Sequence, residues 1–255
     1  MKLGLCTLAF RNDDVREVIR NAANIGFDQV EIFWKQLENK SDAELDEIRS
    51  IAQNSGIEIS GIAPYFWLTN PELWKESMEI AERSSQAALR IGASMIRTFT
   101  DAGPTGIGSD VATQAHWEIA VESLKTITAN APELIFAVET HEKTLADTPA
   151  SCERLLQAVD APNLKVIFQA FGKDSPVEDF LRLEKHVRQV HLNPHIGPHS
   201  HADLEQCGID YAALLRTLAE HNYPYSYAVE FCVPAEASWE RVEKAFHWCR
   251  ALTQK

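Results

Sequence analysis

The sequence predicts a single α/β domain of the (β/α)8 barrel class that spans residues 1–255, and three observations support this prediction. Eight short apolar runs have the composition of buried strands, and amphipathic helical patterns separate them. The whole alternation takes 255 residues, the usual size of such a barrel. Four of the later runs end in a side chain that can bind a metal, as expected where parallel strands end around one active site.

The predicted strands are short, apolar and spread over the whole chain. They cover residues 2–7, 29–33, 57–62, 94–99, 134–139, 164–169, 188–192 and 226–231. The first helix follows Asp13 and Asp14, where apolar residues recur at helical spacing. Ser41 and Glu44 form a capping-box pattern, which predicts the start of the second helix.

Proline marks three further helix starts, because it is favoured at the first helical position directly after a capping residue. The dipeptides concerned are Asn70-Pro71, Thr148-Pro149 and Ser175-Pro176. Apolar stripes at helical spacing predict the last two helices within residues 209–221 and 238–252. Strand and helix thus alternate to the end of the sequence.

An open, doubly wound sheet is the main rival architecture. Sheets of that kind that bind nucleotides usually begin with a glycine-rich first turn. Here the first turn is Leu-Ala-Phe-Arg at residues 8–11, and the sequence contains neither a GxGxxG motif nor a P-loop. The sequence therefore favours the barrel.

Charge and composition argue against several classes of function. The formal net charge of −13 repels a phosphate backbone, so nucleic-acid partners are not expected. No apolar stretch reaches the length needed to cross a bilayer, so no membrane partner is expected either. The five cysteines are odd in number and form no CxxC motif, which fits a reduced, cytoplasmic setting.

Four strand endings predict a metal centre. They are Glu139, Gln169, His191 and Glu230. A lone carboxylate at a strand end is usually solvated or caps a helix, so the joint pattern carries the prediction. Three oxygen ligands and one imidazole suit Mn²⁺, Mg²⁺ or Co²⁺, and Zn²⁺ is also compatible with this set. The expected cofactor is therefore a divalent metal cation.

Side chains on a strand alternate between its two faces, which extends the predicted site. His141 falls on the same side as Glu139. Gln189 and Asn193 fall on the same side as His191. These polar residues are therefore expected around the strand endings.

Long connections follow the fourth and seventh predicted strands, at residues 100–109 and 193–208. Because the loops after the strands build the active site of a barrel, they predict a covered pocket for a small polar substrate. Aromatic residues after the third strand form either a wall of this pocket or ordinary core. The candidate substrate-binding residues are Glu31, Tyr65, Trp67, Arg97, Asn193, His199 and His201.

Several segments together resemble the sugar phosphate isomerase/epimerase family, which has a xylose-isomerase-like TIM barrel. They are residues 3–10, 26–34, 96–99, 138–149, 162–168, 190–193 and 229–231. The metal ligands of that family fall on Glu139, Gln169, His191 and Glu230, and Gln169 stands where an aspartate is usual. An amide oxygen can coordinate a metal but brings no charge. The resemblance therefore implies a more weakly bound and more electrophilic metal, or a site that has lost its metal.

Within the family, residues 96–99 and 139–141 are similar to those of 3-dehydroshikimate dehydratases. This resemblance implies that His141 moves a proton and that Arg97 holds a substrate carboxylate. For Arg97, an ion pair with Glu31 or Asp101 beneath the barrel mouth is the alternative.

The resemblance as a whole implies a metal-dependent isomerase or epimerase of a small keto-sugar or sugar derivative. Such an enzyme removes a proton next to a carbonyl, and the metal stabilises the enediolate. The expected catalytic residues are His141, Glu139, Glu230 and Arg97. A dehydratase-like lyase on a cyclic hydroxy-keto acid is the close alternative, and a non-catalytic binding barrel without its metal is the third. A homodimer is one expected assembly, since barrels of this family often pair.

Overall fold

Eight parallel strands close into a barrel in the computed structural model, which describes residues 1–101, 106–170, 176–197, 200–234 and 237–253. Around the barrel the order is β1, β2, β3, β4, β5, β6, β7 and β10, with β10 pairing back to β1. The bounds are Lys2–Cys6, Gln29–Phe33, Glu58–Ala63, Met95–Thr98, Ile135–Glu139, Leu164–Gln169, Val187–Leu192 and Ser226–Val229. The predicted barrel is confirmed.

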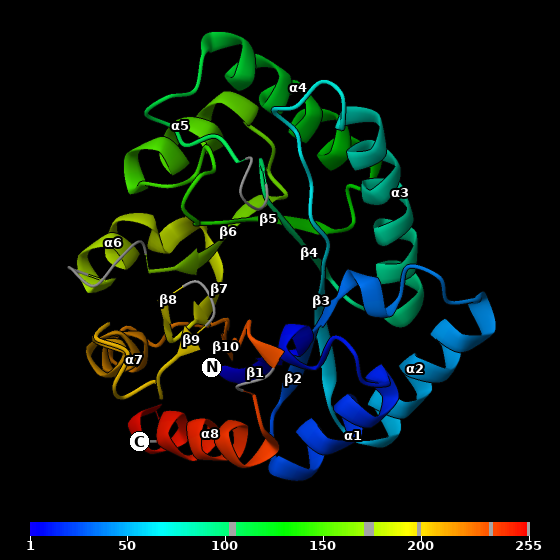
Figure 1. Cartoon of the computed structure of the whole chain (residues 1–255), viewed down its shortest axis with the longest axis vertical. Coiled ribbons are helices and arrows are strands. Elements are labelled where there is room, and N and C mark those ends of the chain that lie inside the picture. Colours follow the sequence, from blue (N-terminus) through cyan, green and yellow to red (C-terminus); the bar gives the residue numbers. More distant parts are fainter. Residues whose placement is uncertain (102–105, 171–175, 198–199, 235–236, 254–255) are drawn as a thin grey trace.

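Helices follow the strands and form an outer ring around the barrel (Figure 1). The helices α1 to α8 are Val15–Ile25, Asp42–Asn54, Trp74–Ile91, Gln114–Asn130, Pro149–Val159, Pro176–Leu183, Tyr211–Glu220 and Trp239–Thr253. The predicted capping box of Ser41 and Glu44 begins α2, and Thr148 caps α5 ahead of Pro149. No helix in the described ranges combines the length and the apolar character needed to cross a membrane.

Two predicted boundaries are wrong. The helix expected at Pro71 begins at Trp74, because the Asn70 side chain accepts a hydrogen bond from the Glu72 backbone and forms a turn instead. The last barrel strand ends at Val229, so Glu230 lies just beyond it. The backbone of Glu230 still donates to Leu192 at 3.1 Å, which keeps its position beside β7 fixed.

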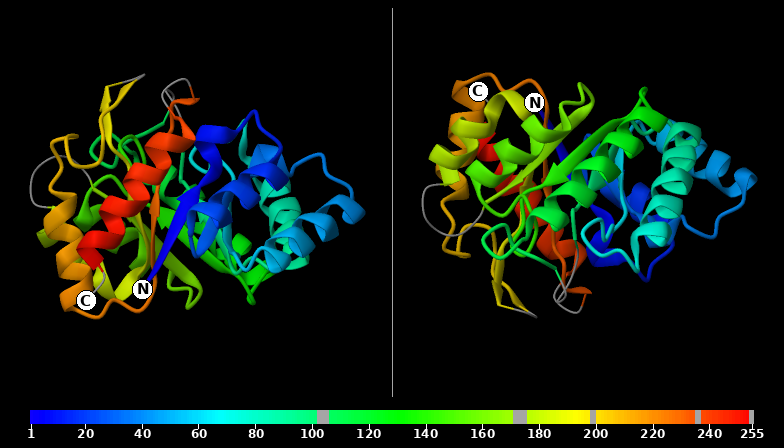
Figure 2. Two further views of the ribbon diagram at one scale, coloured as in Figure 1. Left: turned by 90° about the horizontal axis from the view of Figure 1, so that it is seen from below. Right: turned by 90° about the horizontal axis from the view of Figure 1, so that it is seen from above.

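A short antiparallel hairpin, β8 (His195–Gly197) and β9 (Ser200–His201), interrupts the connection after β7. It stands out at the end of the molecule opposite to the N-terminus (Figure 2). The chain enters β1 at the amino-terminal end of the barrel, so the hairpin marks the carboxyl end, where active sites of this fold lie.

The two faces of the barrel strands differ sharply in polarity. Apolar residues of the outer faces pack under the helices in one large cluster, which includes Leu5, Val30 and Phe136. Inside the barrel, the apolar contacts among described residues form a small cluster of Met95, Ala137 and Ile167, with Ile135 packed against it. Much of the remaining interior is polar and buried, and it carries Gln29, Glu31, Arg97, Gln189 and His191.

The polar interior continues to the amino-terminal end of the barrel, where a cavity of about 190 Å³ opens. Gln29, Ser60, Gln189 and Ser226 are among the residues that line it. Gly4 makes room for this arrangement, because a Cβ atom there would lie 3.0 Å from Cγ of Gln29. Polar side chains therefore lie at both ends of the barrel axis.

Gly61 lets β3 and β4 approach closely, and Gly61→Ala is expected to lower the free energy of unfolding by about 1–3 kcal/mol. An added Cβ would lie 2.9 Å from the backbone oxygen of Met95, which is held in the sheet by pairing and cannot turn away. Urea unfolding measures the change. Gly197→Ala is the matched control, because its Cβ meets nothing within 4 Å. Equal stability of both variants would contradict the close approach.

Candidate active site

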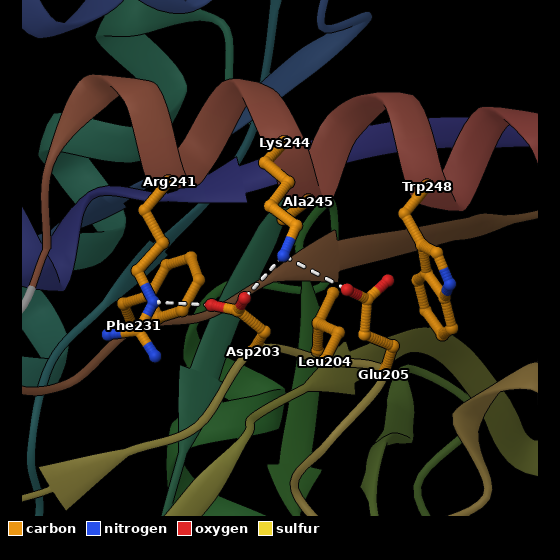
Figure 3. A pocket seen from close by; sticks show the side chains of 8 residues that line it. All are labelled: Asp203, Leu204, Glu205, Phe231, Arg241, Lys244, Ala245 and Trp248. Carbon is orange, nitrogen blue, oxygen red and sulfur yellow. Dashed lines mark hydrogen bonds and ion pairs between the residues drawn. The ribbon is translucent and has the colours of Figure 1, made fainter.

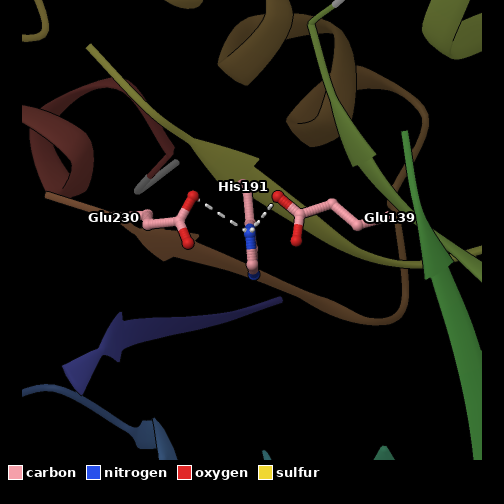
Figure 4. A group of neighbouring side chains, drawn as sticks. All are labelled: Glu139, His191 and Glu230. Carbon is pink, nitrogen blue, oxygen red and sulfur yellow. Dashed lines mark hydrogen bonds and ion pairs between the residues drawn. The ribbon is translucent and has the colours of Figure 1, made fainter. Parts of the chain in front are cut away.

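Three residues from different strands meet inside the carboxyl end of the barrel. Glu139 ends β5, His191 lies on β7 and Glu230 follows β10. All three are buried, and one ligand atom from each lies within 4.8 Å of the others. Nδ1 of His191 lies 3.3 Å from Oε1 of Glu139 and 3.4 Å from Oε2 of Glu230, between the two carboxylates (Figure 4). We call these residues the Glu-His-Glu group.

Gln169, the fourth predicted ligand, reaches the same group from the end of β6. Turned so that its amide nitrogen faces the carboxylates, the side chain lies 3.0 Å from Oε2 of Glu230 and 3.2 Å from Oε1 of Glu139. Thr140 fixes the backbone here, since its hydroxyl donates to the Gln169 carbonyl at 2.6 Å and accepts from its amide at 2.7 Å. The four strand endings that the sequence singles out therefore lie together.

Arg97 on β4 places a positive charge beside the Glu-His-Glu group. Its Nη1 lies 3.1 Å from Oε2 of Glu139, 3.1 Å from Oε1 of Glu230 and 4.0 Å from Oε1 of Glu31. Burial alone would lower the pKa of Arg97, but the neighbouring carboxylates outweigh it and raise this pKa well above its usual value. The guanidinium stays charged and pairs with the two carboxylates of the group more closely than with Glu31.

Two donor groups of Arg97 remain without a hydrogen-bond partner among the described residues, namely Nε and Nη2. The guanidinium carbon lies 5.4 Å from the ring centre of Tyr65 and 5.1 Å from that of Phe99. These rings stack on one another at 5.6 Å. Arg97 therefore offers free donors next to an aromatic wall, an arrangement that can hold a planar anion.

His141 follows Glu139 by two residues and is only partly buried. Its Nδ1 lies 2.8 Å from the carbonyl oxygen of Glu142, and its ring meets Phe99 edge-on at 5.5 Å. A carbonyl oxygen can only accept, so Nδ1 carries the hydrogen of this contact. In the neutral ring, Nε2 then holds the free lone pair and is the atom that can accept a proton.

The other candidate binding residues take different positions. Asn193 directs its amide nitrogen to Gln169 and Glu230, each at 3.2 Å. Tyr65 joins the aromatic wall, and burial raises its pKa to about 12. Trp67 is partly buried, and its backbone nitrogen donates to Ser77 at 2.9 Å.

Of the two histidines predicted in the loop after β7, His201 accepts a hydrogen bond from the Cys232 backbone at 3.1 Å. Its ring lies 5.6 Å from that of Phe231, directly after Glu230. His199 lies outside the described residues.

The segment after the hairpin is anchored to α8 by charged contacts that the sequence did not single out. Nε of Arg241 donates to Asp203 at 3.0 Å, and Lys244 bridges Asp203 and Glu205 (Figure 3). The Arg241 guanidinium also lies over the ring of Phe231, at 5.2 Å. This anchor connects the loop after β7 to the chain that leaves Glu230.

Asp101, directly after β4, is expected to make stability depend on pH. Burial raises the pKa of its carboxyl to about 6, although hydrogen bonds from Thr69 and the Ile107 backbone oppose this. Because the folded protein then holds this proton more tightly than the unfolded chain does, its contribution is full below the model value of 3.8 and is lost as the pH rises through about 6.

Asp101→Asn should remove that decline, and urea midpoints at pH 4.5 and pH 7 measure it. The wild type should lose more stability between the two values than the variant does. An identical pH dependence in both proteins would show that Asp101 titrates normally.

Comparisons with known proteins place this geometry in context. The family model described as "Xylose isomerase-like TIM barrel" matches residues 19–252. A 3-dehydroshikimate dehydratase of Bacillus anthracis is 28% identical over 205 residues, which cover 75% of this chain and 71% of that protein.

Among solved structures, the probable 3-DHS dehydratase AsbF of Bacillus anthracis has a TM-score of 0.83 at 20% identity, with all of both chains covered. The D-psicose 3-epimerase of Clostridium cellulolyticum H10 has a TM-score of 0.81 at 16% identity, again over all of both chains. At these identities the solved structures support the fold alone.

Proposed function

Because the chain belongs to the xylose isomerase-like TIM barrel family, we propose that it is a divalent-metal-dependent enzyme that removes a proton next to a carbonyl. The substrate is a small polar molecule that carries hydroxyl groups. The observation that carries the proposal is the buried Glu-His-Glu group, with His141 near it as a separate base. Gln169 completes a set of four ligands.

The charges around the group support a divalent cation. Three carboxylates, those of Glu31, Glu139 and Glu230, and the one guanidinium of Arg97 together carry a net charge of −2 when ionised. Neutral His191 and one divalent cation bring this total to zero. Oε2 of Glu139 also has no hydrogen-bond partner among the described residues, so a ligand atom is free. The donor set fits Mn²⁺, Mg²⁺, Co²⁺ or Zn²⁺.

Each residue near the group has a separate task in the proposed reaction. The bound cation supplies positive charge that stabilises the negative oxygen formed as the proton leaves. Nε2 of His141 accepts the proton, and a neutral imidazole suits this role near pH 7. Nε and Nη2 of Arg97 hold a substrate carboxylate, and the rings of Tyr65 and Phe99 cover the adjoining face and exclude water.

Two reactions follow from the same first step. Loss of a β-hydroxyl gives a dehydratase acting on a cyclic hydroxy-keto acid, and the free donors of Arg97 favour it, since such an acid presents a carboxylate. The dehydratase relative from Bacillus anthracis supports the same reading. Return of the proton gives an isomerase or epimerase of a keto-sugar. This second candidate is favoured by the position of Glu139 and Glu230 on either side of His191.

A substrate panel assayed with each metal tests the proposal. The panel contains 3-dehydroshikimate, D-psicose, D-tagatose and D-fructose, and the protein is loaded with Mn²⁺, Mg²⁺, Co²⁺ or Zn²⁺ in turn. We expect loss of water from 3-dehydroshikimate, followed by the absorbance of the aromatic product. Turnover of a keto-sugar alone would favour the second candidate. No turnover, and no rise of Tm with any metal, would instead support a non-catalytic binding barrel.

A further inference from the structure

His191 contacts two layers of the barrel interior at once. Its Nδ1 faces the carboxylates of the Glu-His-Glu group, while its Nε2 faces the amino-terminal end of the barrel. There it lies 3.1 Å from Oε2 of Glu31 and 2.9 Å from Nε2 of Gln189. His191 and Gln189 have no exposed surface, and Glu31 is 1% exposed. Whatever sets the proton on Nε2 therefore also sets the lone pair on Nδ1.

The orientation of the Gln189 amide is fixed from the far side. Its Oε1 accepts a hydrogen bond from the Ser226 hydroxyl at 3.2 Å, and its Nε2 donates to Oε2 of Glu31 at 2.6 Å. The nitrogen beside His191 is therefore a donor and cannot accept a proton from the imidazole. The acceptor that remains for the Nε2 hydrogen of His191 is the Glu31 carboxylate.

Glu31 can take this role because other groups hold it in place. The Cys6 thiol lies 3.7 Å from Oε1, and the Arg97 guanidinium lies 4.0 Å from the same atom. Burial works to raise the pKa of Glu31, but the charge and hydrogen bond of His191 outweigh it and lower this pKa. An ionised carboxylate that is fully buried lies beyond the reach of a substrate bound at the barrel mouth. The expected substrate-binding role of Glu31 therefore has a structural alternative.

We propose that Glu31 and Gln189 are positioning residues that hold His191 with its hydrogen on Nε2 and its Nδ1 lone pair directed into the Glu-His-Glu group. This inference rests on the proposed metal-dependent function. A carboxylate that accepts from the outer nitrogen of a ligating histidine fixes the ring and makes it a better ligand. Ser226 and Gln189 extend this support to the cavity at the other end of the barrel.

Metal affinity of the purified chain tests the proposal, with Mn²⁺ as the probe and the EPR signal of free Mn²⁺ as the readout. Loss of an outer-layer partner typically lowers metal affinity by about 10–100-fold, and Glu31→Leu is expected to fall in this range. Glu31→Gln keeps an oxygen that can accept from His191 and should lose less. Gln189→Leu removes the donor that holds Glu31 and should give an intermediate loss.

Asp101→Asn is the matched control, because it also removes a buried carboxylate at the end of a barrel strand. The described contacts of Asp101 run to Thr69 and the Ile107 backbone and not to His191. Its Mn²⁺ affinity should stay within about twofold of the wild type, which corresponds to about 0.4 kcal/mol. A general loss of negative charge would weaken the control as well, so the control separates charge from position.

A second readout is specific to the histidine. In protein loaded with diamagnetic Zn²⁺, the Nε2 hydrogen of His191 should give a downfield, slowly exchanging proton signal in an NMR spectrum of ¹⁵N-labelled protein. Glu31→Leu should abolish the signal, and Glu31→Gln should shift it. Circular dichroism checks that each variant is folded, and Glu31→Gln carries the test if the leucine variant unfolds.

The outcomes separate the two proposals. Failure of the wild type to bind Mn²⁺ would overturn the metal-dependent function and the positioning role together. Wild-type binding with equal affinity and an unchanged His191 signal in the folded Glu31 variants would overturn only the positioning role. Graded loss of affinity, with the control unaffected, is the result that the geometry predicts.

Discussion

His141→Ala is expected to lower kcat by about 10²–10⁴-fold while metal affinity stays unchanged, since this is the usual contribution of a positioned acid or base. The Glu142 carbonyl holds Nδ1 of His141, which leaves Nε2 as the basic nitrogen. His141 makes no described contact with Glu139, His191 or Glu230, so its removal should spare the metal. The measurements are kcat on the substrate identified by the panel and a Mn²⁺ titration.

A control and a contrary outcome sharpen this test. His247→Ala removes an exposed histidine on α8 that pairs with Glu243, and it should leave both measurements unchanged. If His141→Ala keeps wild-type kcat, the proton must pass to a carboxylate of the Glu-His-Glu group. His141 would then contribute only to the aromatic wall beside Phe99. A rise of KM with constant kcat would indicate the same structural role.

Gln169→Asp is expected to tighten metal binding by about tenfold or more, equivalent to about 1.4 kcal/mol. The aspartate adds a charge to a buried site, where opposite charges attract more strongly than in water. In the presence of a chelator the same variant should unfold at a lower Tm than the wild type. The reason is that the added carboxylate then lies beside Glu139 and Glu230 with no cation to balance it.

Gln169→Glu serves as the companion variant, because it adds the charge without changing the size or shape of the side chain. If only the shorter aspartate tightens binding, the geometry of the ligand matters as much as its charge. If neither variant changes the affinity, Gln169 is not a ligand. Isothermal titration with Mn²⁺ and thermal unfolding with and without chelator provide both quantities.

Much of the fold follows from local patterns in the sequence. Alternation of apolar residues locates the strands, and the capping box of Ser41 locates α2. The start of α3 was predicted three residues too early, because Asn70 before a proline is equally good at closing a turn. That competition is decided by the packing around Leu73 and Trp74, which no local pattern reveals.

The candidate site divides in the same way. Its strand-end members are visible because each interrupts an apolar run. The partners of Arg97 are not, since Glu139 lies 42 and Glu230 lies 133 positions away along the chain, and only closure of the barrel brings them within 3.1 Å. Gln189 was placed on the face of His191 by strand alternation, but its contacts with Glu31 and Ser226 depend on strands β2 and β10.

The contrast between the two faces of the strands has a consequence for how this protein can change. Cohesion comes mainly from the apolar layer between strands and helices, which includes Leu5, Val30 and Phe136 and lies outside the barrel. The axis contributes little apolar packing beyond the small cluster around Ala137. Substitutions along the axis can therefore alter the chemistry while the shell keeps the chain folded. A barrel built in this way is free to acquire new reactions one interior residue at a time.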